Sequence, residues 1–293
     1  MNGGRCQTAT YPDSSASPFL LPYTLNEPDA TFVLDYSLEE ISGLTMSVDG
    51  RHLWGVQDED GLLFLLDLTD GSILEEHEFW KDGDYEGIET VEQDLYVVKS
   101  TGTLYRVIRP GQADQQVEKY NEFLDGDNDV EGLAYDKANN RLLLACKADA
   151  GLSSEEEAAK AIYAFNLSTM TMQRDPAYCI RKQDVQEYLN LTPALRNIEK
   201  IVDFFDPDDN DLGFSPSGIA FHPNTGHLYI LSSVGKLLMV LHPDGALLHI
   251  EKLNKDIHQQ PEGICFASDG TLYISNEADG EEPVIHRFEQ QHN

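Results

Sequence analysis

Basic residues are scarce in this sequence of 293 residues. Lysine and arginine together number 20, against 52 aspartates and glutamates, and the formal net charge is -32 at pH 7. Such a charge repels nucleic-acid phosphates and anionic membrane surfaces, which excludes both as electrostatic partners. Cations and basic surfaces are the favoured partners. A solvated surface that serves solubility or a saline habitat, with no ligand, would explain the acidity equally well.

Cysteines and long apolar runs are also rare. The four cysteines, at positions 6, 146, 179 and 265, have a spacing that indicates neither a disulfide framework nor a zinc site. Cys146 and Cys265 fall in predicted strands, where we expect them in the core. No apolar run approaches the roughly 18 residues of a membrane span, so no transmembrane segment is expected.

The first residues contain no apolar signal region. The protein is therefore cytoplasmic, or else periplasmic or in the cell envelope after removal of an export signal. Catalytic signatures are missing as well, since there is no Gly-x-Ser-x-Gly elbow, Walker loop or dinucleotide-binding fingerprint. The nine histidines are scattered through the chain and suggest no general base.

A short motif, in which an acidic or small residue precedes glycine and an apolar pair, occurs five times. Its glycines are separated by 44, 45, 86 and 45 residues and lie at Gly43, Gly87, Gly132, Gly218 and Gly263. A period in this range is typical of solenoids and propellers. After each glycine come further apolar runs divided by turn residues, which predict four antiparallel strands for each motif. We therefore predict an all-β, five-bladed β-propeller.

The ends of the chain suggest how the ring closes. Residues 1–28 are polar and without periodicity, which predicts an irregular leader before a single propeller domain at 29–293. The last motif is followed by too few residues for a fourth strand. We expect the strand predicted at residues 31–36 to supply it and to cover an otherwise open sheet edge.

The long interval of 86 residues between Gly132 and Gly218 allows two interpretations. Near residues 180–205 its apolar residues recur at spacings of three and four, which predicts a helical insertion in a five-bladed ring. The alternative is a sixth blade whose motif has eroded.

Carboxylates accompany the motif at two levels, immediately before the glycine and two residues earlier. In a propeller the first strand of each blade lines the central channel, and residues two apart on a strand face the same side. The predicted metal site therefore combines six carboxylates from four motifs, namely Glu40, Asp84, Glu86, Asp129, Glu131 and Glu262.

Like charges confined in a narrow channel call for a positive charge between them. Because the donors are all oxygens, the expected cofactor is Ca²⁺. Lys99 and Lys147, or water, could neutralise the ring without a metal. The predicted ligand-binding residues at the same mouth are Asp58, Lys99, Lys147, Ser217, Asn276 and Glu277.

The chain resembles the bacterial SdiA-regulated family, within the wider NHL-repeat and paraoxonase-like propellers, from about Leu38 to Phe288. The motifs that carry the resemblance are Glu40-Ile41-Ser42-Gly43-Leu44-Thr45, Val130-Glu131-Gly132-Leu133-Ala134-Tyr135, Tyr229-Ile230-Leu231-Ser232-Ser233, Gln260-Pro261-Glu262-Gly263-Ile264 and Leu272-Tyr273-Ile274-Ser275-Asn276-Glu277. The resemblance implies a five-bladed propeller with a calcium site, no established enzymatic activity, and an envelope or exported setting.

Three functions are consistent with these observations. The first is a calcium-binding module whose channel mouth engages a small ligand or another protein. The second is a calcium-dependent lactonase or esterase, in which the ion polarises a carbonyl oxygen and a carboxylate activates water. The third is a structural propeller without metal.

Overall fold

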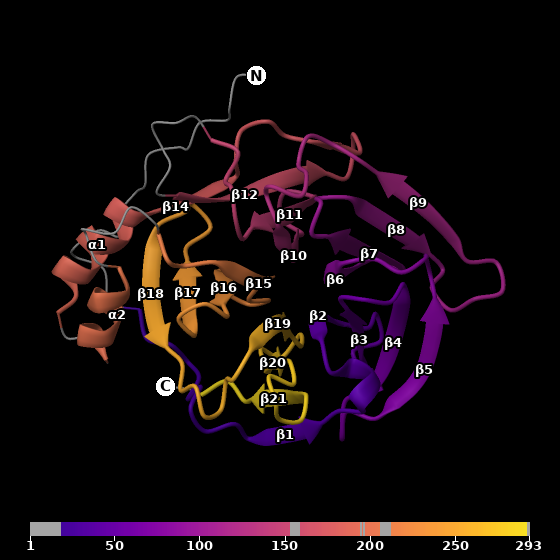
Figure 1. Cartoon of the computed structure of the whole chain (residues 1–293), viewed down its shortest axis with the longest axis horizontal. Helices are drawn as coiled ribbons and strands as arrows, with labels where there is room; N and C mark the ends of the chain where they lie inside the picture. Colours follow the sequence, from indigo (N-terminus) through magenta and orange to yellow (C-terminus); the bar gives the residue numbers. More distant parts are fainter. Residues whose placement is uncertain (1–18, 153–158, 194, 196, 206–211, 292–293) are drawn as a thin grey trace.

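Five antiparallel sheets surround one central axis in the computed structural model, which describes residues 19–152, 159–193, 195, 197–205 and 212–291 (Figure 1). The first strand of each blade lies nearest the axis, and later strands lie progressively further out. The predicted five-bladed, all-β propeller is confirmed, and the six-bladed alternative is wrong.

Each blade takes its strands in chain order from the axis outward. Blade 1 contains β2 (Ile41–Met46), β3 (His52–Gln57), β4 (Leu62–Asp67) and β5 (Ile73–Glu78). Blade 2 contains β6 (Tyr85–Val91), β7 (Asp94–Lys99), β8 (Leu104–Ile108) and β9 (Gln116–Tyr120). Blade 3 contains β10 (Val130–Asp136), β11 (Arg141–Cys146), β12 (Ala159–Asn166), β13 (Thr171–Met172) and β14 (Tyr178–Arg181). Blade 4 contains β15 (Pro216–Phe221), β16 (Leu228–Ser232), β17 (Leu237–Leu241) and β18 (Leu247–Lys252).

Blade 5 joins the two ends of the described chain. It contains β19 (Pro261–Phe266), β20 (Leu272–Asn276), β21 (Val284–Phe288) and, at its outer edge, β1 (Ala30–Val33). The predicted closure by the N-terminal strand is therefore confirmed. The strand is shorter than expected, because Asp35 accepts a hydrogen bond from the backbone N–H of Ser37 and caps the 3-10 helix η1 (Tyr36–Leu38).

The long interval contains no sixth blade among its described residues. The outer strand of blade 3 is split, and β13 and β14 pair with different parts of β12 on either side of Pro176, which has no N–H to donate. The predicted helical insertion follows as α1 (Lys182–Leu191) and α2 (Ile198–Phe204). Helix α1 packs beside β18, and the Tyr188 hydroxyl donates to the carbonyl of Leu248 at 2.9 Å.

Apolar side chains fill the spaces between neighbouring blades, so that each interface forms its own core. Cys146 and Cys265 are buried in these cores, as predicted. Cys179 is disulfide-bonded, however, and the prediction of no disulfide is wrong at this residue. Spacing along the chain does not reveal which distant segments the ring brings together.

The described part of the predicted leader packs on the propeller. Tyr23 and Leu25 are buried, and the Tyr23 hydroxyl donates to the carbonyl of Gly270 at 2.6 Å. Residues 1–18 of that leader lie outside the described residues. In the described chain, no helix has both the length and the apolar character needed to cross a membrane.

The motif glycines allow the blades to approach one another closely at the axis. A Cβ added to Gly218 would lie 2.1 Å from the Glu262 carbonyl oxygen in the next blade, and one added to Gly43 would lie 2.9 Å from the Gly87 Cα. Because both obstacles are backbone atoms of packed inner strands, a side chain there would push two blades apart.

We expect Gly218→Ala to lower the free energy of unfolding by about 2 kcal/mol through overpacking at the axis. Gly126→Ala is the matched control, because nothing lies within 4 Å of a Cβ at this position. Urea denaturation of both variants measures the effect. Equal stability of the two variants would contradict a role for close blade approach.

Candidate functional site

The residue before the glycine of each motif lies in a β-bulge. The register between the first and second strands shifts there in every blade, at Ser42, Glu86, Glu131, Ser217 and Glu262. A bulge redirects a side chain out of the regular alternation of a strand. The space that these motifs enclose at the axis is only about 10 Å³, which separates the acidic mouth from the opposite one.

The earlier carboxylates, three residues before each glycine, do not lie on the first strands. Glu40, Asp84 and Asp129 come immediately before β2, β6 and β10. The prediction that both levels lie on one continuous strand is therefore wrong, because the strands begin only after the earlier carboxylates. The two levels are nevertheless close, because the charge of Asp84 raises the pKa of Glu86 and that of Asp129 raises the pKa of Glu131.

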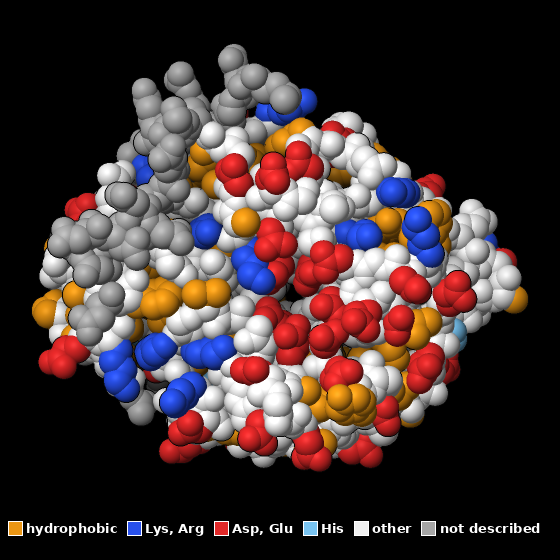
Figure 2. Space-filling model, in the orientation of Figure 1, with side chains coloured by type: hydrophobic (Ala, Val, Ile, Leu, Met, Phe, Trp, Pro, Cys, Tyr) orange, Lys and Arg blue, Asp and Glu red, His pale blue; other side chains and the backbone are white. Residues whose placement is uncertain are grey.

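The three glutamates of the first level interact across blades, as predicted. Burial and then the charge of Glu131 raise the pKa of Glu86 to about 10. Burial and then the charge of Glu262 raise the pKa of Glu131 to about 8. These shifts express the cost of placing several negative charges in one poorly solvated space. Acidic side chains accordingly surround the central hollow of this face in Figure 2.

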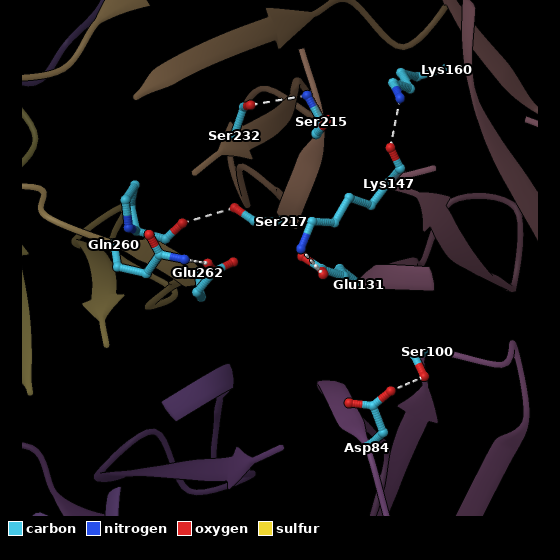
Figure 3. Close-up of polar contacts among 11 residues, drawn as sticks. Asp84, Ser100, Glu131, Lys147, Lys160, Ser215, Ser217, Ser232, Gln260 and Glu262 are labelled. Atoms are coloured by element: carbon cyan, nitrogen blue, oxygen red, sulfur yellow. Dashed lines mark hydrogen bonds and ion pairs between the residues drawn. The ribbon is translucent and has the colours of Figure 1, made fainter. Parts of the chain in front are cut away.

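Lys147 neutralises one side of this acidic ring. Its Nζ forms an ion pair with Glu131, toward which its side chain extends in Figure 3. Burial opposes the charge on Lys147, yet the carboxylates of Glu131 and Glu262 raise its pKa above the usual range. On this side Glu262 also accepts a hydrogen bond from Gln260 Nε2 at 2.9 Å.

Lys99, at the corresponding end of β7, behaves differently. Its Nζ lies over the ring of Tyr85, 5.4 Å from the centroid. The described residues show no ion pair between Lys99 and a carboxylate. Of the two lysines that could neutralise the acidic ring, only Lys147 forms an ion pair with one of its carboxylates.

The other side of the mouth has buried polar atoms without partners. Asp58 Oδ1 and both side-chain amide atoms of Asn276 make no hydrogen bond within the described chain, and Asn276 is only 2% exposed. Burial and then the neighbouring Glu40 raise the pKa of Asp58 to about 7. Burial and then Asp58 raise the pKa of Glu277 to about 7. Unpaired polar atoms at this depth indicate that a ligand or ion belongs between them.

Two further predicted residues, Ser217 and Asp84, form hydrogen bonds within the described chain. The Ser217 hydroxyl donates to the Pro261 carbonyl at 2.8 Å, so it already has a partner in the next blade. Asp84 accepts a hydrogen bond from the Ser100 hydroxyl. Beside the ring lies a hollow of about 280 Å³, lined by Glu39, Glu40, Gln260, Glu277, Ala278 and Asp279.

A metal ion at the acidic mouth would need several oxygen donors that converge on one point. Among the described residues, no group of three or more His, Cys, Asp or Glu side chains is arranged to hold a metal ion as it stands. The chemistry of the donors still fits a hard cation, since all are oxygens and several carry uncompensated charge. On the side away from Lys147, the charge of Glu40 raises the pKa of Asp58, and the charge of Asp58 raises the pKa values of Glu86 and Glu277.

Fold and site together define a five-bladed β-propeller with an acidic mouth at one end of its axis. The sequence model of the family described as SdiA-regulated matches residues 29–187 and 206–279. The chain therefore belongs to the SdiA-regulated family, which confirms the resemblance found in its motifs. The unmatched residues 188–205 contain α2, so the helical insertion departs from the family pattern.

Several solved structures share the fold at low sequence identity. Glutaminyl cyclase from Myxococcus xanthus is 10% identical, with a TM-score of 0.54 over 90% of this chain and 96% of that one. The PQQ-bound aldose sugar dehydrogenase from Streptomyces coelicolor is 12% identical, with a TM-score of 0.50 over 91% and 97%. A luciferin-regenerating enzyme is 9% identical, with a TM-score of 0.50 over 89% and 95%. These similarities establish the fold alone.

Proposed function

We propose that this protein is a calcium-binding module that engages a partner at its acidic channel mouth. The observation that carries the proposal is a pair of buried side-chain oxygens, Oδ1 of the half-buried Asp58 and Oδ1 of the buried Asn276, which lack hydrogen-bond partners among the described residues. They lie beside carboxylates whose pKa values are raised by one another's charges. A cation would satisfy the unpaired oxygens and remove that repulsion.

The two sides of the ring have different roles in this proposal. Lys147 serves as a fixed cation for Glu131 and Glu262. Calcium serves the opposite side, where Asp58 is close enough to Glu40, Asp84 and Glu86 for their charges to interact. Calcium accepts six to eight oxygen ligands in flexible geometry, which suits carboxylates from several blades better than the strict octahedron of Mg²⁺.

The hollow of about 280 Å³ beside the ring gives a small ligand or a protein side chain access to the ion. An exported or envelope setting is part of the proposal. Its support is the disulfide bond at Cys179, because disulfides form and persist mainly in oxidising compartments.

Neither alternative function gains specific support. The calcium-dependent lactonase or esterase stays a prediction, because no contact among the described residues distinguishes one carboxylate as the base that would activate water. The structural propeller without metal explains the fold. It leaves the unpaired Asp58 and Asn276 atoms unexplained.

Calcium is expected to stabilise the EDTA-treated protein against heat. A ligand that binds only the native state at about 100 times its Kd adds about 2.7 kcal/mol, which raises the melting temperature of a domain of this size by about 5 °C or more. Thermal melts with CaCl₂, MgCl₂ or EDTA alone measure the shift. Magnesium should give a smaller one.

Matched glutamate variants localise the ion. Glu86→Gln should reduce the calcium-induced shift by at least half, because it removes a carboxylate from the ring. Glu76→Gln removes an exposed carboxylate from β5 and should leave the shift unchanged. A melting temperature that calcium does not change, or an equal response of both variants, would remove the calcium proposal.

A further inference from the structure

A second cavity opens at the other mouth of the propeller, away from the acidic ring. It measures about 590 Å³, within the range of small-molecule sites. The inner strands begin at the acidic mouth and end here, and turns between first and second strands complete the wall. The inner-strand residues in its lining are Thr45, Glu89, Tyr135, Asp136, Ala220, Phe221, Cys265 and Phe266.

The same repeat that builds the acidic ring also builds this cavity. Two residues after the motif glycine, the five blades place Thr45, Glu89, Ala134, Ala220 and Cys265. All but Ala134 line the cavity, and Glu89 is the only charged residue of the five. The remaining side chains are small, so they leave open space around one carboxylate.

The Glu89 carboxylate is held in a fixed orientation. It accepts hydrogen bonds from the Thr45 hydroxyl at 2.8 Å, the Thr90 N–H at 2.9 Å and the Tyr135 N–H at 3.0 Å. Burial raises its pKa to about 7 although these three donors oppose the shift. The charge of Glu89 also contributes to the raised pKa of Cys265, which places the two residues close together across the axis.

No positive group compensates this charge within the described residues, where Glu89 forms no ion pair. The other two charged residues in the lining are Asp136 and Lys137. Asp136 is already paired with Arg141 at 2.8 Å. Lys137 is exposed and lies in the turn after β10.

Aromatic residues line the same cavity as Glu89, and two of their rings are themselves held in place. Tyr178 donates a hydrogen bond to the Pro243 carbonyl at 3.0 Å and ties blade 3 to blade 4. His222 packs against Phe266, with ring centroids 5.1 Å apart, and its Nδ1 accepts from the Asn224 N–H at 3.2 Å. The walls are therefore preorganised, which lowers the entropic cost of binding a ligand.

We infer that this second mouth binds a small organic amine with an aromatic or other apolar body. The ammonium would pair with Glu89, and the body would pack on Tyr135, Phe221 and Phe266. A buried carboxylate beside aromatic faces is the usual recognition chemistry for such cations, since both the charge and the ring quadrupoles attract them. The net charge of -32 attracts cations to the surface as well.

Benzylamine binding to the full chain tests this inference, measured by calorimetry in about 150 mM NaCl to screen the surface charge. Benzyl alcohol has the same body without the charge. We expect saturable benzylamine binding at one site that weakens about tenfold or more in Glu89→Gln. Benzyl alcohol should bind the wild-type protein about tenfold or more weakly than benzylamine does. Glu76→Gln, an exposed charge change of the same kind, should bind benzylamine like wild type.

Three results would overturn the inference. The first is the absence of saturable benzylamine binding to wild type. The second is equal affinity in Glu89→Gln and wild type, with both shown to be folded by circular dichroism. The third is equal affinity for benzylamine and benzyl alcohol, which would show that the cavity recognises only the apolar body. Because this mouth is separate from the acidic ring, none of these results bears on the calcium proposal.

Discussion

The metal-free protein is expected to lose about 3 kcal/mol of stability as the pH rises from about 6.5 to about 8, because its buried carboxylates must ionise. Burial and then the neighbouring glutamates and Asp58 raise the folded-state pKa of Glu86, Glu131, Glu262 and Glu277 to values between about 7 and about 10. The ordinary pKa of a glutamate side chain is about 4.5. These groups therefore hold protons in the folded protein that the unfolded chain has already released.

The sign follows from proton linkage. Since the folded state binds more protons in this window, the free energy of unfolding falls with rising pH, by at most about 1.4 kcal/mol per pH unit for each group. The buried histidines act in the opposite direction at lower pH. Burial lowers the pKa of His258 to about 4, so the unfolded chain takes up its proton first as the pH falls below about 6.5. Between about pH 4.5 and 6.5 the carboxylates and the histidines therefore oppose each other, and above about pH 6.5 the carboxylates alone set the fall in stability.

Urea denaturation at several pH values, with EDTA or with CaCl₂, measures this profile. Calcium should flatten the alkaline limb, because a bound cation removes much of the cost of ionising the ring. A flat profile in EDTA would show that solvent already compensates these carboxylates. An equally steep profile in both solutions would show that calcium does not reach them.

Much of the fold could be predicted because its repeat is local. Each blade is marked in the sequence by one motif glycine and by runs in which apolar residues alternate with polar ones. These patterns depend only on residues that are close together along the chain. The glycines mark where first strands of adjacent blades touch, as at Gly218 and Glu262. The missing strand of blade 5 followed from counting, and β1 supplies it.

The features that could not be predicted depend on contacts between distant segments. The disulfide at Cys179 is one example. The bulge before each glycine is another, because it reflects how two paired strands share hydrogen bonds and not the order of residues. Pro176 carried a signal for the split outer strand of blade 3, since proline cannot donate to a ladder.

For the candidate site, the sequence predicted which carboxylates come together but not which partners the side chains have. Repeat position alone predicted that Glu86, Glu131 and Glu262 come together. All three lie at equivalent β-bulges around the axis, where the charge of Glu131 raises the pKa of Glu86 and that of Glu262 raises the pKa of Glu131. The different partners of Lys99 and Lys147 reflect a difference of one position in register that the repeat did not reveal. Lys99 is the last residue of β7 and pairs with Tyr85, whereas Lys147 follows β11, whose last residue Cys146 pairs with Val130. The cavity around Glu89 was missed. The same count, taken two residues after the glycine, would have revealed one charge among small side chains.

Replacement of Lys147 by methionine should lower the free energy of unfolding by about 3–4 kcal/mol near pH 8, because it leaves two buried carboxylates without their cation. Glu131 is 6% exposed and Glu262 is 5% exposed, so water solvates these carboxylates poorly, although the Lys147 side chain is itself 32% exposed. The loss should shrink near pH 5.5, where both carboxylates are protonated in the folded protein. Urea denaturation at the two pH values measures the difference.

Lys99→Met is the matched control, since Lys99 ends the equivalent strand of blade 2 and lies on the Tyr85 ring. We expect it to cost less than about 1 kcal/mol at either pH, as is usual for a partly exposed cation over an aromatic ring. Combining Lys147→Met with Glu131→Gln should recover at least half of the lost stability, because the second change removes the charge that the first left unpaired. Equal losses for the two lysine variants, or no recovery in the double variant, would show that Lys147 stabilises the mouth by packing and not by charge.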